Sequence, residues 1–416
     1  MLLAMRFLAR TARVYSAPVL LITLTLSLAA FTASMARTLD THSIARADYR
    51  GTVDVRLEYQ QTAISGAEGI PAPPPPLTSI DYLLLPPEDY LSIPGVTAAT
   101  RAASSNTTLI SSTGSDDATF LAIDRQTLPE VLDKSWRSNY ADESLGALMN
   151  RLADSPDAAL ISEQYAADHG LRSGDVVRLS LNDRGESEEV AFRIVGTVRY
   201  FPSLYAEQGP YLIGNLDYSA DEQGGIYLYE VWLATTPTAN LATIKAYAQG
   251  NGLDVRKGTP QELLAADLQR PERQGLFGLL SVGFLAAALV TMLGFLIFSL
   301  VSFQRRLVEL GMLRAIGLGT SQLTTLLIVE QALVIGVGTL AGTVLGVLAS
   351  RLFVPFLQVR TGEFPDTPPF VVQIAWEQIA QISMVAGALL VLTVVATMLL
   401  LQRMRIFEAV KLGEAV

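Results

Sequence analysis

The sequence predicts an α-helical membrane protein with four transmembrane helices and a large α+β extracytoplasmic domain between the first and second helix. Half of the 416 residues are hydrophobic, and the mean hydropathy is +0.35. The apolar residues gather into four stretches that each reach the roughly 20 residues a helix needs to cross a bilayer. The remaining long block is mixed and polar, like an ordinary globular domain. The predicted spans are residues 17–36, 275–303, 323–357 and 378–401.

Lys and Arg residues predict the orientation of the spans, because cytoplasmic loops beside a membrane collect them. Basic residues precede the first span, lie between the second and third, and follow the fourth: Arg6, Arg10, Arg13, Arg305, Arg306, Arg314, Arg403, Arg405 and Lys411. The block 37–274 instead holds 19 basic and 33 acidic residues. We therefore expect a multi-pass protein of the cell (inner) membrane, with both termini in the cytoplasm and the acidic block outside.

The first two segments each have two interpretations. In residues 1–16, three arginines recur at helical spacing, which is typical of a cytoplasmic interfacial helix on anionic headgroups. Ordinary flanking charge is the alternative. The apolar run 17–36 is longer than the roughly 7–15 residues of a signal-peptide core, which favours a retained first helix. Ser34-Met35-Ala36 resembles a cleavage site, so a removed signal peptide is the alternative.

The block 37–274 has the pattern of an α+β domain. Alternating apolar and polar residues predict strands, and helical periodicity predicts helices, without a regular βαβ rhythm. The block is long enough to bury its own core without disulfides, and the chain has no cysteine. The predicted strands are 53–59, 80–85, 96–102, 119–123, 176–181, 189–198 and 228–234, and the predicted helices are 128–134, 144–152, 163–169, 239–249 and 260–268.

Several activities are disfavoured by what the sequence lacks. It has no G-x-x-x-x-G-K-[ST] motif for nucleotide phosphates and no G-x-S-x-G motif for a nucleophilic serine. Two histidines and no cysteine make a metal site improbable. The net charge of −10 argues against nucleic-acid binding. We expect no catalytic residue, no metal, no cofactor and no enzyme activity in this chain.

The segment between the second and third predicted spans is basic and interrupted by glycines. Leu307, Leu310 and Leu313 recur every three residues, and Gly317 is a natural residue to end a helix. This pattern predicts a short cytoplasmic helix with apolar and basic groups available to a partner. A helix that lies on the lipid headgroups and binds no partner is the alternative.

The third predicted span carries two features that concern helix packing. Gly338, Gly342 and Gly346 form one helix stripe, where another helix can approach closely, within the chain or across a dimer. Glu330 lies about seven residues into the span, roughly 10 Å from its start. Ionisable groups at such depth are costly and are usually paired or functional. A structural contact with a neighbouring helix or with Arg314 is favoured over proton or substrate handling.

Residues 305–317, RRLVELGMLRAIG, are followed by a span with Glu330 and repeated glycines. This combination resembles the FtsX/MacB-type permease domain of ABC transporters, the mechanotransmission type. The resemblance covers residues 275–416, and the layout of one span, a large exterior domain and three more spans also matches. The stretch 160–205 is similar to the periplasmic domains of such permeases. Because the chain has no nucleotide-binding motif, the resemblance implies an ATPase on a separate chain.

The family resemblance also implies partners and a mode of action. The ATPase, which binds ATP and Mg²⁺, would dock on the loop between the second and third spans. The residues implied for this dock are Glu309, Leu310, Gly311, Leu313, Arg314 and Gly317. A second permease copy or a homologous half would complete the unit among membrane lipids. ATP-driven motion would reach the exterior domain, for export or extraction of a lipid, lipoprotein, peptide or hydrophobic compound.

Other functions stay open at this level. An FtsX-like regulator would transmit the motion of the ATPase to an extracellular cell-wall hydrolase and transport nothing. A membrane-anchored receptor would act without any ATPase. Some family members carry two permease halves, so the chain could be the C-terminal half of a longer permease, in a homodimer or a heterodimer. The sequence does not predict the substrate or the direction of transport.

Overall fold

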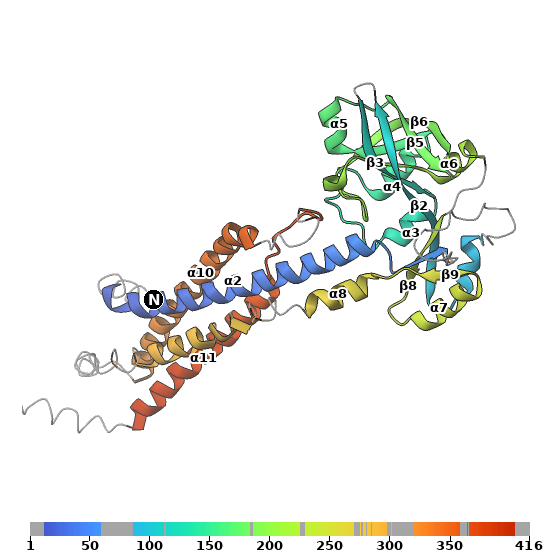
Figure 1. Cartoon of the computed structure of the whole chain (residues 1–416). Helices are drawn as coiled ribbons and strands as arrows, with labels where there is room; N and C mark the ends of the chain where they lie inside the picture. Colours follow the sequence, from blue (N-terminus) through green and yellow to red (C-terminus); the bar gives the residue numbers. More distant parts are fainter. Residues whose placement is uncertain are drawn as a thin grey trace, which may run out of the picture. The chain divides into compact units, whose positions relative to one another are not determined.

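A computed structural model describes residues 12–59, 86–111, 114–183, 186–224, 229–269, 320–357, 364 and 366–403, together with most of 275–301. The chain divides into two compact units. The helical unit comprises residues 1–42, 269–359 and 370–416. The sheet unit comprises residues 43–268 and 360–369. Figure 1 shows long helices in the first unit and the labelled strands in the second.

The described helices of the helical unit are the first part of α2 (Ala12–Gly51), up to residue 42, the apolar helix Ser281–Ile297, α10 (Thr320–Phe353), η3 (Val354–Leu357) and α11 (Trp376–Arg403). Two of its described helices are long and apolar enough to cross a membrane, over Ser16–Gly51 and Ile328–Phe356. The helix Ser281–Ile297 is shorter. Of the four predicted spans, two are therefore supported by length and composition in the described residues.

α2 extends 15 residues past the predicted end of the first span, from residue 36 to Gly51. Hydropathy predicts only the part of a helix that lies in lipid. The helix itself is longer, because tertiary packing stabilises its polar continuation. Ala45, Ala47 and Tyr49 are buried in this extension. The extension belongs to the sheet unit from residue 43 onward, so the boundary between the two units falls inside α2.

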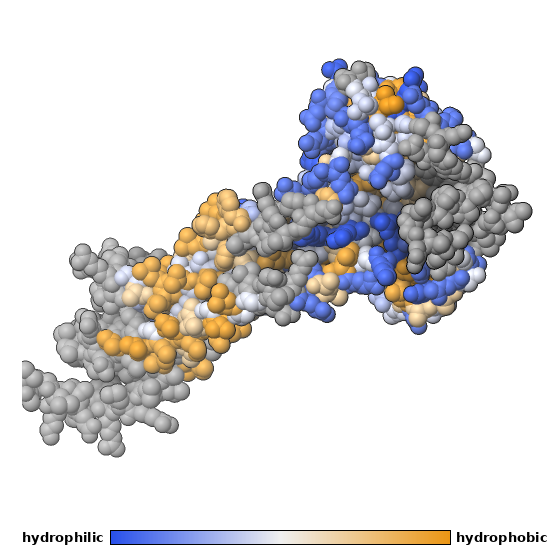
Figure 2. Space-filling view, in the orientation of Figure 1, coloured by the Kyte–Doolittle hydropathy of each residue, from blue (hydrophilic) through white to orange (hydrophobic). Residues whose placement is uncertain are grey.

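The surfaces of the two units differ in polarity. Figure 2 shows apolar residues over the described helices of the helical unit and mostly hydrophilic residues over the sheet unit. Large apolar side chains exposed on the helices include Leu285, Leu289, Leu340, Leu352, Met384 and Leu392. A soluble protein rarely exposes a contiguous apolar surface of this kind, and lipid is the solvent that suits it.

The sheet unit is built around a nine-stranded sheet in the order β3-β7-β4-β6-β5-β2-β8-β1-β9. The strands are β1 (Val55–Tyr59), β2 (Val96–Ser111), β3 (Gly114–Ile123), β4 (Ala158–Ser162), β5 (Val176–Asp183), β6 (Glu186–Val198), β7 (Tyr211–Asn215), β8 (Glu230–Thr235) and β9 (Leu253–Val255). The helices are η1 (Pro87–Ser92), α3 (Leu128–Leu132), α4 (Leu145–Arg151), α5 (Glu163–His169), η2 (Ala206–Gln208), α6 (Leu216–Glu222), α7 (Leu241–Gly250) and α8 (Pro260–Leu268).

Six of these strands close on themselves. β3 pairs with β7 at one end of the strand order and also with β2, so β3, β7, β4, β6, β5 and β2 form a ring. β2 is long enough to serve two sheets, because its first half pairs with β8 and its second half with β5. β8, β1 and β9 continue from that first half as an open, antiparallel extension.

The ring encloses one apolar cluster to which all six strands contribute. Phe120 and Phe192 are fully buried in it, with ring centroids 5.0 Å apart. Gly214 on β7 leaves room for both rings, since a Cβ there would lie 2.9 Å from Phe192 and 3.0 Å from Phe120. A second cluster lies on the opposite face of β3, β4, β6 and β7, where α3 and α4 cover the strands.

The structure contains two strands in the ring that sequence periodicity does not predict. Four residues of β7 and all five of β4 are buried, so neither strand alternates between apolar and polar residues. A short, wholly apolar run cannot be assigned by periodicity alone. The predicted strand 80–85 lies outside the described residues.

Replacing Phe120 by Ala is expected to lower the free energy of unfolding of the sheet unit by about 3–5 kcal/mol, because it empties a large site in the closed ring. Thermal unfolding of the full chain in detergent measures this change. Leu241→Ala is the matched control, since Leu241 is 41% exposed and its truncation leaves no cavity. Equal effects of the two substitutions would contradict a packed ring interior.

Candidate functional site

The glycine stripe of α10 lies directly against α2. A Cβ atom on Gly342 would lie 2.9 Å from the Cβ of Leu26 and 2.9 Å from the carbonyl oxygen of Thr23. Added Cβ atoms on Gly338 and Gly346 would also come within 3 Å of α2 atoms. Any larger residue at these positions would separate the helices. The stripe therefore serves packing within the chain.

α2 and α10 run in the same direction along this contact. Gly338 faces residue 22 of α2, and each further glycine faces a position four residues later. The hydroxyl of Thr23 also donates a hydrogen bond to the carbonyl oxygen of Gly338 (3.4 Å). The approach is therefore maintained over two helical turns, as small residues permit between helices in lipid.

Glu330 occupies the same stripe. The buried residues of α10 recur every four positions, as Glu330, Val334, Gly338, Gly342, Gly346 and Ser350, with Gln331 buried beside the first. The Glu330 side chain is only 4% exposed. A buried carboxyl group requires a polar or charged partner. Glu330 lies at the start of the helix-packing stripe, and its structural role stays a prediction.

A second helix is joined to α2 by threonines. The hydroxyls of Thr25 and Thr291 form a short hydrogen bond between α2 and the helix Ser281–Ile297. Gly294 lies one turn further, where a Cβ would be 2.8 Å from the side chain of Leu21. The described part of α2 thus packs on one helix through glycines and on another through paired hydroxyls.

In the sheet unit, the last turns of α2 are held by Tyr49. Its hydroxyl donates to the carbonyl oxygen of Leu204, and its own carbonyl oxygen accepts from the backbone N–H of Ser203 (2.9 Å). The rings of Tyr140 and Tyr205 meet it edge-on, at centroid distances of 5.6 and 5.3 Å. Tyr49 is fully buried, so this end of α2 is inserted into the unit.

α8 runs beside the same end of α2. The hydroxyl of Ser43 donates to Oδ2 of Asp267 (2.6 Å), near the end of α8. Gly51 lies against the start of α8, where a Cβ would be 2.6 Å from the ring of Pro260. The two segments are therefore antiparallel neighbours, and the missing side chain at Gly51 allows the close contact.

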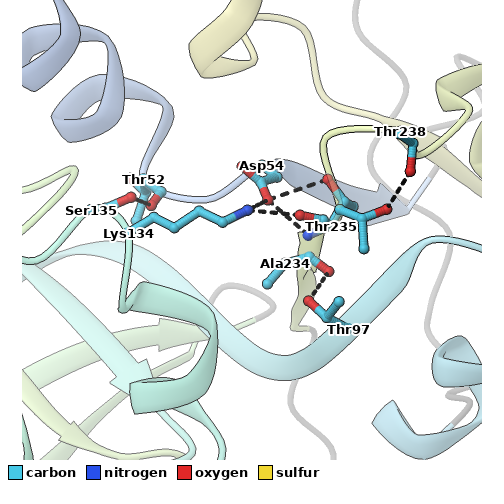
Figure 3. Close-up of polar contacts among 9 residues, drawn as sticks. Thr52, Asp54, Thr97, Lys134, Ser135, Ala234, Thr235 and Thr238 are labelled. Atoms are coloured by element: carbon cyan, nitrogen blue, oxygen red, sulfur yellow. Dashed lines mark hydrogen bonds and ion pairs between the residues drawn. The ribbon is translucent and has the colours of Figure 1, made fainter.

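A polar cluster fixes the turn from α2 into β1 (Figure 3). Thr52 has a φ of +67°, a left-handed conformation that a β-branched residue rarely adopts. Asp54 Oδ2 accepts from the backbone N–H of Thr235 (2.7 Å) and from Lys134 Nζ (2.7 Å). Lys134 also donates to the carbonyl oxygen of Thr235 (2.7 Å). The hydroxyl of Ser135 donates to the backbone carbonyl oxygen of Thr52.

Arg56 continues this anchor on β1. Its guanidinium group stacks over the ring of Trp232, 4.7 Å from the centroid, and donates to the hydroxyl of Thr52. Burial lowers the pKa of Arg56 to about 10, although the nearby Glu230 acts to raise it. Arg56 therefore stays charged at neutral pH and holds the first strand after α2 to β8.

These anchoring residues were not singled out from the sequence. Asp54 and Lys134 are 80 residues apart, and Asp54 and Thr235 are 181 apart, so no local pattern connects them. The predicted docking residues Glu309, Leu310, Gly311, Leu313, Arg314 and Gly317 lie outside the described residues, as do residues 1–11. Within the described part of the chain, no group of three His, Asp or Glu side chains could hold a metal ion.

Comparison with known families identifies the C-terminal part of the chain. Residues 281–409 match the family described as FtsX-like permease C-terminal. This segment is an FtsX-like permease C-terminal domain.

Three solved structures show a distant similarity to this chain. The extracellular domain of the noncanonic ABC-type transporter YknZ from Gram-positive bacteria has 15% identity and a TM-score of 0.30, over 49% of this chain and 99% of that one. The periplasmic region of MacB from Actinobacillus actinomycetemcomitans has 12% identity and a TM-score of 0.34, over 53% and 95%. A permease-protein domain from Porphyromonas gingivalis has 16% identity and a TM-score of 0.27, over 39% and 72%. No curated protein matches the chain.

Replacing Gly342 by Leu is expected to destabilise the helical unit by about 1–3 kcal/mol, because the side chain would overlap α2. The unfolding midpoint of the full permease in detergent measures this loss. Gly336→Leu is the control on the same helix, since no atom lies within 4 Å of a Cβ placed there. A midpoint that falls equally for both variants would contradict the packing role.

Replacing Asp54 by Ala is expected to destabilise the sheet unit by about 1.5–3 kcal/mol, because the N–H of Thr235 loses a charged acceptor. Hydrogen exchange of the Thr235 amide in the full permease reports the loss directly. Asp217→Ala is the control, since Asp217 also pairs with a basic residue but its side chain is 77% exposed, against 13% for Asp54. The control should change stability by less than about 1 kcal/mol.

Proposed function

We propose that this chain is an FtsX/MacB-type permease subunit of an ABC transporter. It couples ATP hydrolysis by a separate ATPase to movement of the sheet unit, for export or extraction of a lipid, lipoprotein, peptide or hydrophobic compound. The observation that carries the proposal is the continuity of α2. It is one helix from Ala12 to Gly51, with residues 12–42 in the helical unit and 43–51 in the sheet unit. A continuous helix carries a displacement along its axis with little loss, because each backbone hydrogen bond resists stretching.

The contacts of α2 support this role at each of its ends. In the helical unit, glycines and threonines hold it against two other helices. In the sheet unit, Tyr49 is inserted among Tyr140, Tyr205 and the loop at Leu204. A helix anchored in this way cannot slip against either set of neighbours. A shift of α10 would therefore draw α2 and the residues around Tyr49 with it.

The proposed topology places the sheet unit outside the cell and both termini in the cytoplasm, with four membrane spans. The basic residues flanking the predicted spans support it, together with the net charge of the block 37–274. The third and fourth spans would be α10 and α11, and the second would include the helix Ser281–Ile297. In this orientation the start of α10 lies on the cytoplasmic side.

The proposed dock for the ATPase is the loop before α10, through Glu309, Leu310, Gly311, Leu313, Arg314 and Gly317. Its supports are the family match, which includes these residues, and the absence of a nucleotide-binding motif from the chain. Force applied to this loop would enter α10 at Thr320 and reach α2 through the glycine stripe. ATP and Mg²⁺ would be bound by the partner and not by this permease.

Replacing both Leu313 and Arg314 by Ala is expected to lower the stimulation of the partner's ATPase activity by about tenfold or more, because a few central residues dominate most interfaces. The measurement uses the permease–ATPase complex in lipid nanodiscs, with co-purification of the two chains as a second readout. Membrane insertion should be unchanged.

The matched control replaces Arg351 and Leu352, an Arg–Leu pair at the other end of α10. Leu352 is 62% exposed, so its truncation leaves no cavity in the described structure. This control should retain stimulation and co-purification. If the Leu313 and Arg314 variant co-purifies with the ATPase and stimulates it as the wild type does, the proposed dock is wrong.

A further inference from the structure

A short segment before α11 is attached within both units. We call residues 364–375 the strap, of which the structure describes Phe364 and residues 366–375. The boundary between the units crosses it between Pro369 and Phe370. Among the described residues, it is, like α2, a segment with contacts inside each unit that crosses from one unit to the other.

The first part of the strap is held in the sheet unit. The ring of Phe364 stacks on the ring of Tyr205, with centroids 4.1 Å apart and an interplanar angle of 28°. The hydroxyl of Thr367 donates to the carboxylate of Glu207, at 2.8 and 3.0 Å from its two oxygens. Thr367 is buried, whereas Glu207 is exposed, and the bond is charge-assisted because its acceptor is a carboxylate.

The second part of the strap is held on α2 in the helical unit. The backbone N–H of Gln373 donates to the hydroxyl of Thr38 (2.9 Å), and that of Ala375 donates to the hydroxyl of Ser34 (3.3 Å). Ser34 and Thr38 are one turn apart on α2 and are both fully buried. One turn further, the ring of His42 meets Phe370 edge-on, with centroids 4.9 Å apart.

The segment between these two attachments is short and has few free backbone angles. Pro368 and Pro369 have fixed φ angles and follow Thr367 directly. Only five residues lie between Thr367, attached to Glu207, and Gln373, attached to Thr38. A short segment with two consecutive prolines transmits a pull better than a flexible loop, because few backbone angles can absorb it.

The strap and α2 also meet the same residue. Tyr205 receives the edge of Tyr49 from α2 and the face of Phe364 from the strap. At its other end, the strap is bonded to α2 itself, through Thr38 and Ser34. The strap is therefore attached to Ser34 and Thr38 of α2 within the helical unit and to Tyr205 and Glu207 within the sheet unit. The stretch of α2 between Ser34 and Tyr49 includes the boundary between the two units.

We propose that the strap is a brace on α2, which prevents this stretch from bending and is needed for motion to pass from the helical unit to the sheet unit. Thr367, Thr38 and Ser34 are its positioning residues. The inference rests on the proposed function, in which α2 transmits the motion. It adds that α2 alone is insufficient and that the loop between α10 and α11 takes part in coupling.

The test measures whether the two attachments of the strap depend on each other. In Thr367→Val, the amides of Gln373 and Ala375 should exchange hydrogen about tenfold faster, because a lost hydrogen bond to a charged group frees the first attachment. Hydrogen exchange followed by mass spectrometry on the full permease in nanodiscs, without ATPase or nucleotide, reads these amides in the peptide 370–376. Phe364→Ala, which weakens the same attachment by another contact, should give the same result.

Two further variants make the outcome decisive. Thr38→Val removes the acceptor of the Gln373 amide and shows the exchange rate of a released strap. Thr97→Val removes a comparable threonine bond, to the carbonyl oxygen of Ala234 in the sheet unit, and should leave the strap amides unchanged. If the exchange rates of the Gln373 and Ala375 amides are unchanged in both Thr367→Val and Phe364→Ala, the proposal is wrong. Faster exchange spread evenly over the sheet unit would overturn it too, because that pattern reports general destabilisation.

A second measurement separates this inference from the proposed function. In the complex with the ATPase in nanodiscs, Thr367→Val should lower ATPase stimulation severalfold while co-purification stays intact. If Thr367→Val stimulates the ATPase as much as the wild type does, the proposed role of the strap is wrong, and the proposed role of α2 is unaffected. Absence of stimulation by the wild-type permease would instead contradict the proposed function, and the exchange experiment would still report whether the strap is a brace.

Discussion

The close approach of α2 and α10 is the contact on which the rest of the helical unit depends. Helices in lipid gain little from burying apolar side chains, so they associate through close van der Waals packing and hydrogen bonds. The glycines of α10 permit such packing over two turns, where even a methyl group would come within 3 Å of α2 at each glycine. The described apolar side chains on other faces of these helices are consequently left for lipid.

The sheet unit holds its end of α2 by different physics. Here water is the solvent, and a helix terminus must satisfy or bury its last polar groups. Tyr49 does this with an aromatic cluster and two hydrogen bonds to backbone groups. Asp54, just before β1, accepts a hydrogen bond from the backbone N–H of Thr235. The positive φ of Thr52 is tolerated because Ser135 and Arg56 bond to it from two sides. In the helical unit, α2 is therefore held by close contact with the glycines of α10. In the sheet unit, it is held by hydrogen bonds and aromatic contacts of its side chains.

Sequence patterns predicted the helices and strands whose residues repeat with a regular helical or strand period. Alternation placed β1, β5 and β8 within a few residues, and α8 was predicted with the bounds that the structure shows. β4 and β7 were missed because burial on both faces removes alternation. The predicted glycine stripe is where α2 and α10 meet, although its partner could not be known beforehand. Glu330 was recognised by its cost in an apolar run, whereas Tyr49, Asp54 and Thr367 look like ordinary polar residues until their distant partners are in place.

The sequence by itself determined where the apolar stretches lie, the net charge of the segments between them and the match of residues 281–409 to the FtsX-like permease C-terminal family. Those properties depend on composition and spacing along the chain, which no fold can alter. Only the tertiary structure decided that the glycines face α2, that six strands close into a ring, and that the strap joins Glu207 to Thr38. The reason is that each of these contacts joins residues more than 100 positions apart or depends on which face of a helix or strand is covered.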